Sequence, residues 1–441
     1  MSTPLRTYIA APDATQPRLW YAWEALTRPL GYEPVRVEGA SADVILGDSQ
    51  DGNDGFSGLR LPLTDHLPVG DPRPLDIHRA ETMDIRGRTL PVMGGGDIVS
   101  SAFLWLSGWQ ERAATARDEH GRFRYGASWQ QALQCVDVPV VDWYRLHLHD
   151  QLKAAGIRQP ALPPWAAALT FDIDALRKPR LGQIARALGK AVSGDVGEAV
   201  ADLRDGVMAD PWQEGLGQIR GALARRGFTG TAFFKSASRS PFDLPIRLRD
   251  LTREVPRWEL AGFEIGFHPG YFAYDQPGTA ARELRDLQIR AQRPVMAVRQ
   301  HYLRWNENTP SQQGRLGLAY DASLGFAERE GFRHATSFPF RLYDFSREAP
   351  QSVIQIPLLA MDTTLYQYRK MDVESVASAI NRMITAAREV GGCAHFLWHN
   401  TAFDTKEYPG RWKGLTELLN QLSAAKARTY RLSELPHLSF V

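Results

Sequence analysis

The chain has 441 residues, of which 44% are hydrophobic and 23% are charged, and its formal net charge is +2. This balance is typical of a globular protein of two or three domains, and it gives no electrostatic reason to expect binding to nucleic acid. The two cysteines, Cys135 and Cys393, are too few for a disulfide framework or a thiolate zinc cluster. Because we find neither a secretory signal nor a run of about 20 apolar residues, we expect a cytoplasmic protein without a transmembrane segment.

Three prolines in residues 158–164 suggest a linker, so we predict an α/β domain over residues 1–160 and a second domain over residues 161–441. The elements expected in the first domain are a strand at 6–10, a helix at 19–30, a strand at 42–47, a loop-rich stretch at 52–87, a helix at 97–114 with Asp97 as N-cap, and a helix within 138–154.

In the second domain, strand and helix patterns alternate, which indicates parallel strands joined by helical crossovers. The strands are expected at 166–172, 230–234, 263–268, 295–301, 331–337, 353–360 and 393–399. The helices are expected at 215–226, 248–261, 279–290, 371–390 and 410–427. About seven strands can close into a barrel instead of remaining an open sheet.

Five segments of this domain end in residues that bind metals or move protons. These ends are Asp172 with Asp174, His268, Arg299 with His301, Asp362, and His399. The carboxyl ends of parallel barrel strands meet at one rim, where barrel enzymes carry their chemistry. We therefore expect these side chains to surround one site.

Asp172 and Asp174 are two positions apart on a strand and project to the same side. A cation beside one of them would separate their pKa values, which makes Asp174 a candidate metal ligand and Asp172 a candidate base. The alternative is a carboxylate pair that caps the next helix. His268 precedes the sharp turn Pro269-Gly270 and is well placed for a metal, although a lone histidine can also be structural.

Arg299 and His301 share one face of their strand. The guanidinium could orient a carboxylate base by a bidentate contact, or it could close the barrel as a buried salt bridge. His399 suits a general acid, whereas His395, deeper on the same face, is expected to pack in the core. Asp362 could orient His399, reach a substrate, or form a turn.

Nucleotide-binding and serine-hydrolase motifs are missing. The sequence has no Gly-x-Gly-x-x-Gly after a predicted strand, no phosphate loop and no Gly-x-Ser-x-Gly.

The segments resemble the polysaccharide deacetylases, carbohydrate esterase family 4, over roughly residues 165–435. The motifs that carry the resemblance are Thr170-Phe171-Asp172-Ile173-Asp174, Thr231-Ala232-Phe233-Phe234, Glu264-Ile265-Gly266-Phe267-His268, Arg299-Gln300-His301-Tyr302, Tyr320-Asp321-Ala322-Ser323 and Leu397-Trp398-His399. Upstream, residues 97–103 and 118–123 resemble the uncharacterised N-terminal domain that precedes a bacterial branch of these deacetylases.

The resemblance implies an α/β fold, a distorted (β/α)7 barrel preceded by the smaller α/β domain, and metal-dependent removal of an N-acetyl group from a sugar. Carried over by position, Asp172 is the general base, Asp174 and His268 are metal ligands, Arg299 positions the base, and His399 is the general acid. The expected cofactor is Zn2+, with Co2+, Ni2+ or Mn2+ as alternatives.

Two positions depart from the family pattern. Phe272 stands where the family usually has a second metal histidine, and His301 stands where proline is usual. Our hypothesis is that the third ligand has moved to His301. The alternatives are a weaker two-ligand site or a barrel that has lost catalysis.

For the substrate side, Tyr271, Tyr302 and Trp398 are expected to stack on sugar faces, with Asp362 as a further substrate contact. The Tyr302 backbone N–H is a candidate oxyanion donor. The expected substrates are acetylated sugars, whether nucleotide-linked, lipid-linked or oligosaccharide, in bacterial surface polysaccharide biosynthesis. Two other readings stay open: a catalytically silent carbohydrate-binding or scaffold barrel, and a hydrolase of non-sugar amides.

Overall fold

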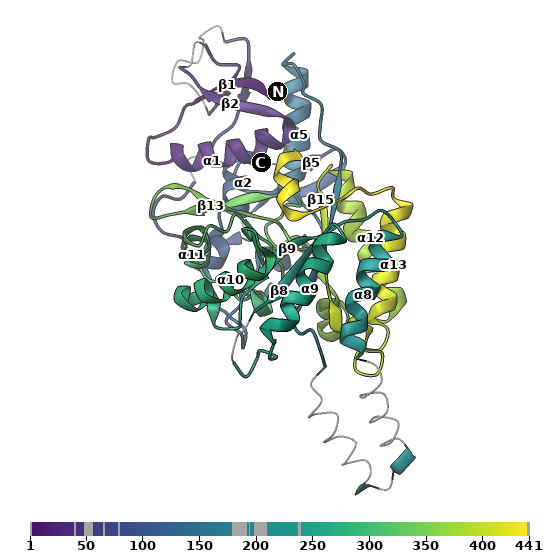
Figure 1. Cartoon of the computed structure of the whole chain (residues 1–441). Coiled ribbons are helices and arrows are strands. Elements are labelled where there is room, and N and C mark those ends of the chain that lie inside the picture. The colour runs from purple at the N-terminus through teal and green to yellow at the C-terminus, as the bar shows by residue number, and fades with distance from the viewer. Residues whose placement is uncertain are drawn as a thin grey trace.

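The structure is a computed structural model. It describes residues 2–38, 41–47, 56–64, 67–77, 80–178, 192–193, 195–197, 210–236 and 240–438. The chain is an α/β protein in which a small N-terminal sheet lies beside a larger, mostly parallel sheet surrounded by helices (Figure 1).

The N-terminal part contains a parallel sheet of order β2-β1-β3-β4 and a hairpin of β5 and β6. Its strands are β1 (Thr3–Ile9), β2 (Tyr32–Arg36), β3 (Val44–Leu46), β4 (Leu59–Leu61), β5 (Glu81–Ile85) and β6 (Arg88–Val92). Its helices are α1 (Gln16–Thr27), η1 (Arg28–Leu30), α2 (Ile98–Leu106), α3 (Trp109–Ala113), η4 (Tyr125–Ala127), α4 (Trp129–Ala132) and α5 (Val140–Ala154).

Two expectations for this part are corrected. The stretch 52–87, expected to be loop, contains β4 and β5; its residues 52–55, 65–66 and 78–79 lie outside the described residues. A β5–β6 turn with positive φ at Arg86 (54°) and Gly87 (79°) matches strand twist, so a hairpin forms. The single helix expected over 97–114 is two helices, because Gly108 adopts a left-handed conformation between α2 and α3.

Asp97 is the predicted N-cap of α2. Its Oδ1 accepts hydrogen bonds from the backbone N–H groups of Val99 and Ser100, at 3.0 and 2.8 Å.

The larger sheet closes into a barrel. Its parallel members are β7 (Ala166–Ile173), β8 (Thr231–Lys235), β9 (Glu264–His268), β10 (Ala297–Val298), β11 (Tyr320–Asp321), β13 (Ala349–Gln355), β14 (Ala360–Met361) and β15 (Cys393–His399). Adjacent members pair in the order β11-β10-β9-β8-β7-β15-β14. The ring closes because β13 pairs with β11, and β14, further along the same chain segment, pairs with β15. The predicted (β/α)7 barrel is thereby confirmed.

Helices cover the outside of this ring (Figure 1). They are α8 (Pro211–Ala224), α9 (Leu248–Leu260), α10 (Pro277–Ala291), α11 (Thr309–Arg315), α12 (Val373–Glu389) and α13 (Arg411–Ala424). Smaller elements are β12 (Phe340–Asp344), β16 (Thr429–Tyr430), η5 (Ala273–Asp275), η6 (His301–Leu303), η7 (Thr364–Tyr368), η8 (Asn400–Phe403) and η9 (Leu432–Leu438). Among the described residues, none of these helices combines the length and apolarity needed to cross a bilayer.

The strand expected at 331–337 is wrong, since these residues form turns and the fifth ring member is β11. The apolar residues here are buried, as a strand pattern requires, but their backbone forms no strand ladder. Gly331 N–H donates to the carbonyl of Leu359, and Cys393 N–H donates to the carbonyl of Ser337, both in the barrel. Phe332 N–H donates to the carbonyl of Val136, and Val141 N–H donates to the carbonyl of Ala335.

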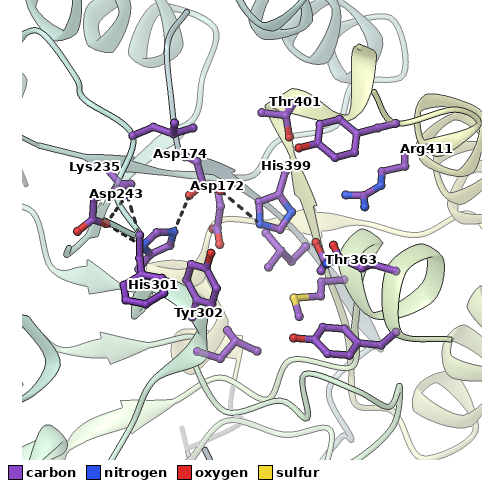
Figure 2. Close-up of a pocket in the computed structure, with 18 of the residues that line it drawn as sticks. Asp172, Asp174, Lys235, Asp243, His301, Tyr302, Thr363, His399, Thr401 and Arg411 are labelled. Atoms are coloured by element: carbon purple, nitrogen blue, oxygen red, sulfur yellow. Dashed lines mark hydrogen bonds and ion pairs between the residues drawn. The ribbon is translucent and has the colours of Figure 1, made fainter. Parts of the chain in front are cut away.

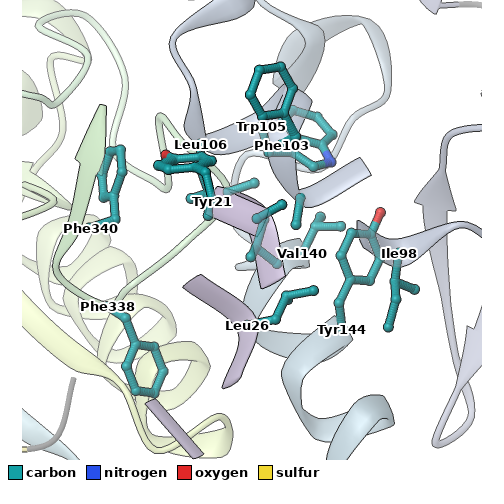
Figure 3. Packing of buried hydrophobic residues seen from close by; sticks show 14 of the residues in the cluster. Tyr21, Leu26, Ile98, Phe103, Trp105, Leu106, Val140, Tyr144, Phe338 and Phe340 are labelled. Atoms are coloured by element: carbon teal, nitrogen blue, oxygen red, sulfur yellow. The ribbon is translucent and has the colours of Figure 1, made fainter. Parts of the chain in front are cut away.

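Side chains of β7 alternate between two cores. Ala166 and Ala168 point into the barrel and belong to a cluster that also includes N-terminal residues, whereas Leu169 and Phe171 pack under the outer helices. In the first cluster, Tyr21 of the N-terminal part lies near Phe340 of the barrel part (Figure 3). The rings of Tyr21 and Phe103 also pack edge-on against Tyr343, with centroids 5.2 and 5.1 Å apart. The two parts of the chain therefore share one hydrophobic core.

Candidate active site

The three predicted metal ligands meet at the barrel rim. Asp174 follows β7, His268 ends β9, and His301 comes shortly after β10. One ligand atom from each lies within 4.8 Å of the others. Asp174 Oδ1 is 3.1 Å from His268 Nε2 and 3.5 Å from His301 Nε2. The third member of the cluster is thus His301, whereas the side chain of Phe272 is 41% exposed.

In His268 and His301, the hydrogen bond made by Nδ1 fixes the ring so that Nε2 faces Asp174. His268 Nδ1 is 2.6 Å from the carbonyl oxygen of Arg299, and His301 Nδ1 is 2.9 Å from Asp243 Oδ1. Because these oxygens only accept, each Nδ1 carries the hydrogen and donates it. In a ring whose only hydrogen is on Nδ1, the lone pair of Nε2 faces the Asp174 carboxylate. Acceptor atoms that converge in this way are stabilised by a cation, so the residues fit a divalent metal.

The protonation states suit metal binding. Burial lowers the pKa of His301 to about 4, although Asp243 and Asp174 act to raise it. Burial acts to raise the pKa of Asp174. A hydrogen bond from His268, and the positive charge that His301, His399 and His268 carry when they are protonated, hold that pKa well below its usual value. Near neutral pH the cluster therefore offers an ionised carboxylate and a neutral His301, the forms that bind a metal.

Asp172 and Arg299 are buried beside the cluster. Asp172 Oδ2 is 3.7 Å from His268 Nε2, and Asp172 Oδ1 is 3.5 Å from Arg299 Nη1. The expected bidentate contact is wrong, because Arg299 donates from Nε to the carbonyl of Ala322 and from Nη2 to Thr170 Oγ1, at 3.1 and 2.8 Å. Asp172 Oδ1 consequently has no hydrogen-bond partner among the described residues. Because Oδ1 is also buried, Oδ2, on the side of His268, is the oxygen that Asp172 presents to the cavity.

A layer beneath the rim holds Arg299 in place. His395 Nδ1 donates to the carbonyl of Pro357 at 3.0 Å, so its Nε2 accepts from Arg299 Nη2, also at 3.0 Å. Burial and the Arg299 charge keep the pKa of His395 well below its ordinary value. The Phe233 ring lies 4.8 Å from the centre of the guanidinium. His395 is in the core, as predicted, and orients Arg299.

His399 faces the metal cluster from β15, with Nε2 3.8 Å from Asp174 Oδ2. Its Nδ1 is 2.6 Å from Oδ1 of the buried Asp362, which follows β14. Burial acts to lower the pKa of His399, but the charge and hydrogen bond of Asp362 outweigh it and raise that pKa to about 9. His399 is therefore protonated at neutral pH, and Asp362 orients it, one of the roles expected from the sequence.

These groups border a cavity of about 430 Å3 (Figure 2). Tyr302 lines this cavity, is 37% exposed, and has a left-handed backbone with φ of 60°. Tyr271 and Trp398, also expected at the substrate, are buried and are not among the residues that line the cavity. Strand alternation explains Trp398: Leu397 and His399 face the cavity, so Trp398 faces the outer helices.

Two polar residues of the site were missed by the sequence reasoning. Asp243 accepts from Lys235 Nζ at 2.5 Å and from Ser240 Oγ at 2.7 Å while it orients His301. Lys235 could have been found from the sequence, because strand alternation makes it the last inward-facing residue of β8. Asp243 had none, since it lies between strand and helix in a segment without periodicity.

Comparisons with known proteins bear on both parts of the chain. Residues 78–156 match a family of unknown function, DUF7033. No curated protein matches the chain.

Several solved structures align with the chain at low sequence identity. A candidate polysaccharide deacetylase from Mycobacterium smegmatis has 17% identity and a TM-score of 0.43, covering 64% of this chain and 92% of its own. A candidate polysaccharide deacetylase from Pseudomonas aeruginosa has 13% identity and a TM-score of 0.41, covering 63% and 91%. A family 4 carbohydrate esterase from Streptomyces lividans, solved with acetate, has 12% identity and a TM-score of 0.31, covering 60% and 91%.

Proposed function

We propose that this protein is a metal-dependent hydrolase that removes an acyl group, such as acetyl, from the nitrogen of a sugar. The observation that carries the proposal is the convergence of Asp174, His268 and His301 between a buried carboxylate, Asp172, and a protonated imidazole, His399. A base and an acid on either side of a metal site are what amide hydrolysis requires.

Zn2+ is the proposed cation, because two nitrogen ligands and one oxygen ligand leave a position open for chemistry. When bound, the cation would activate a water molecule and polarise the acyl carbonyl group. Asp174, His268 and His301 would hold it.

The remaining steps belong to protein side chains. Asp172 accepts the proton of the attacking water through Oδ2, the oxygen on the side of the metal cluster, and Arg299, beside Oδ1, keeps this carboxylate in place. The Tyr302 backbone N–H is the proposed donor to the oxyanion, a contact worth about 3–4 kcal/mol. His399, fixed by Asp362, protonates the departing amine, which leaves poorly as an anion.

The proposed substrates are acylated sugars that are nucleotide-linked, lipid-linked or part of an oligosaccharide. We further propose that the protein acts in the cytoplasm on precursors of bacterial surface polysaccharides. Fractionation of native cells tests this location, and recovery of the protein outside the cytoplasm would contradict it.

The activity is tested with zinc-loaded protein and a panel of N-acetylated sugars and simple amides, with acetate and ammonia both measured. We expect acetate release, and Asp172→Asn should lower kcat by about 10²–10⁴-fold while zinc content stays stoichiometric. Ammonia release alone would point to a non-sugar amide substrate. Stoichiometric zinc without hydrolysis of any compound would contradict the proposal.

A further inference from the structure

The cavity has a wall that the metal cluster does not use. In Figure 2, Arg411 and Thr363 lie across the cavity from Asp243 and His301. This wall, which we call the arginine wall, is formed by Arg122, Thr363, Gln367, Tyr368 and Arg411. It draws Arg122 from the N-terminal part of the chain, Arg411 from the start of α13, and the other residues from η7 and the position before it.

Arg411 is a buried cation with almost no protein partner. Its side chain is 9% exposed, and among the described residues its guanidinium meets only Asp362 Oδ2, at 3.6 Å, and the face of the Tyr408 ring, at 4.4 Å. Asp362 already accepts a hydrogen bond from His399 at 2.6 Å. The N–H groups of Arg411 are therefore available to a ligand in the cavity.

Arg122 is presented by a tight turn. Asp118 Oδ1 accepts from the backbone N–H groups of His120 and Arg122, and Asp118 Oδ2 accepts from Arg122 Nε at 2.6 Å. Gly121 supplies the left-handed residue that this turn requires, with φ of 76°.

The guanidinium of Arg122 then reaches both sides of the rim. Nη1 donates to the carbonyl of Tyr302 at 3.1 Å, and Nη2 donates to Tyr368 Oη at 3.0 Å. With Nε bound to Asp118, three of the five N–H groups are used. The other two, one on each terminal nitrogen, have no hydrogen-bond partner among the described residues.

The charges of the cavity are separated. Its acidic lining residues are Asp172, Asp174 and Asp243, and all three are engaged at or beside the metal cluster. The arginine wall exposes guanidinium donors to the cavity and no carboxylate of its own. A planar fork of N–H donors is the group that proteins use to bind phosphate and carboxylate.

We propose that the arginine wall binds an anionic group, phosphate or carboxylate, on the acylated sugar, and that Arg122 and Arg411 are its ligands. The inference rests on the proposed function for the sugar. Because Arg122 lies in the N-terminal part of the chain, that part would contribute to the choice of substrate.

The test compares kcat/KM of the zinc-loaded full chain for N-acetylglucosamine 1-phosphate, N-acetylmuramic acid and methyl N-acetylglucosaminide, which carry a phosphate, a carboxylate and no charge. The wild type should prefer one of the two anions over the neutral sugar. Arg411→Gln and Arg122→Gln should each reduce that preference about tenfold or more. Arg249→Gln, on the exposed side of α9, is the matched control and should keep the wild-type preference.

Calorimetric binding of N-acetylglucosamine 1-phosphate and N-acetylmuramic acid to the same proteins separates this inference from the proposed function. If no sugar is hydrolysed but Arg411→Gln weakens binding of either anion, the anion site stands and the proposed function fails. If the wild type hydrolyses neutral and anionic sugars equally well, the inference is overturned and the proposed function stands. The inference is also overturned if both arginine variants keep the preference and the affinity of the wild type. Arg411→Gln is the decisive variant, because only Arg122 bonds to the Tyr302 carbonyl.

Discussion

At the residue scale, the histidines of the site are controlled by the atoms behind them. The Arg299 carbonyl, Asp243 and Asp362 each accept a hydrogen bond from a different imidazole Nδ1. In every case Nε2 is left facing the cluster, so these acceptors decide which nitrogen does the chemistry. Their removal should change metal affinity or proton transfer while leaving the barrel intact.

His301 gives the first prediction. His301→Ser removes one of three ligand atoms but leaves the Lys235–Asp243 pair, at 2.5 Å, in place. We expect zinc content, measured by mass spectrometry after dialysis, to fall far below one ion per chain. Phe272→Ser, at the exposed ring that replaces the usual histidine, is the control and should keep its zinc. Stoichiometric zinc in His301→Ser would mean that His301 is not a ligand.

Asp362 gives the second prediction. Asp362→Asn removes the charge that raises the pKa of His399 to about 9, so this pKa should fall toward or below the usual 6.5. Histidine NMR signals of chelator-treated protein report the shift directly, and the alkaline limb of kcat should move to lower pH. Asp71→Asn, at an exposed aspartate, should leave the titration unchanged. An unshifted His399 in Asp362→Asn would contradict the assignment.

The same pair makes stability depend on pH. Because folding raises the pKa of His399, the stabilisation is complete below about pH 6.5 and is lost as pH rises through about 9. The decrease in Tm between pH 7 and pH 10 should therefore be larger for the wild type than for Asp362→Asn.

At the scale of elements, close packing between β8 and β9 inside the barrel supports the position of the Arg299 guanidinium. Gly266 of β9 faces Phe233 of β8, and a Cβ at position 266 would lie 2.3 Å from Phe233 Cδ1. The absence of a side chain at Gly266 leaves room for the Phe233 ring, which in turn lies against the Arg299 guanidinium.

Gly266→Ala should therefore lower the free energy of unfolding by about 1–3 kcal/mol, measured by urea denaturation. Gly278→Ala in α10 is the matched control, since nothing lies within 4 Å of a Cβ built there. Its effect should stay within about 0.5 kcal/mol. Equal stabilities of the two variants would show that the barrel interior repacks without cost.

At the scale of the whole molecule, buried charge joins the N-terminal part to the barrel. Glu111 of α3 accepts from Arg333 Nε and Nη2, at 2.7 and 2.8 Å, and lies 3.3 Å from His334 Nε2. All three residues are almost completely buried. Because the two parts also share a hydrophobic core, we expect the whole chain to unfold in one calorimetric transition. Two transitions would mean that residues 1–160 and 161–441 behave as separate domains.

Glu111→Gln leaves the Arg333 charge buried without its partner, and we expect a loss of about 3–5 kcal/mol in unfolding free energy. Glu33→Gln removes the exposed pair with Arg28 and should cost at most about 1 kcal/mol. Two separate calorimetric transitions in the wild type, or equal losses in the two variants, would contradict this account.

The sequence was sufficient for the barrel and for the three residues of the candidate metal cluster. Strand alternation predicted that Asp172 and Asp174, and Arg299 and His301, share one face, and parallel strands bring such ends to one rim. These inferences need only the local period of a strand and the direction of its neighbours. His301 was proposed as a ligand for another reason, because Phe272 stands where the related family usually has a second metal histidine. In the structure β7 ends at Ile173 and β10 at Val298, so Asp174, Arg299 and His301 lie just beyond their strands.

Tertiary structure alone decided the rest of the site. Asp243 comes from a segment without periodicity and Arg122 from a turn in the other part of the chain, so no local pattern pointed to either. Residues 331–337 have a strand-like burial pattern, yet their backbone groups bond partly to the N-terminal part, at Val136 and Val141, and partly to the barrel, at Leu359 and Cys393. Such contacts depend on chain segments far apart in sequence, and packing, rather than local conformational preference, selects them.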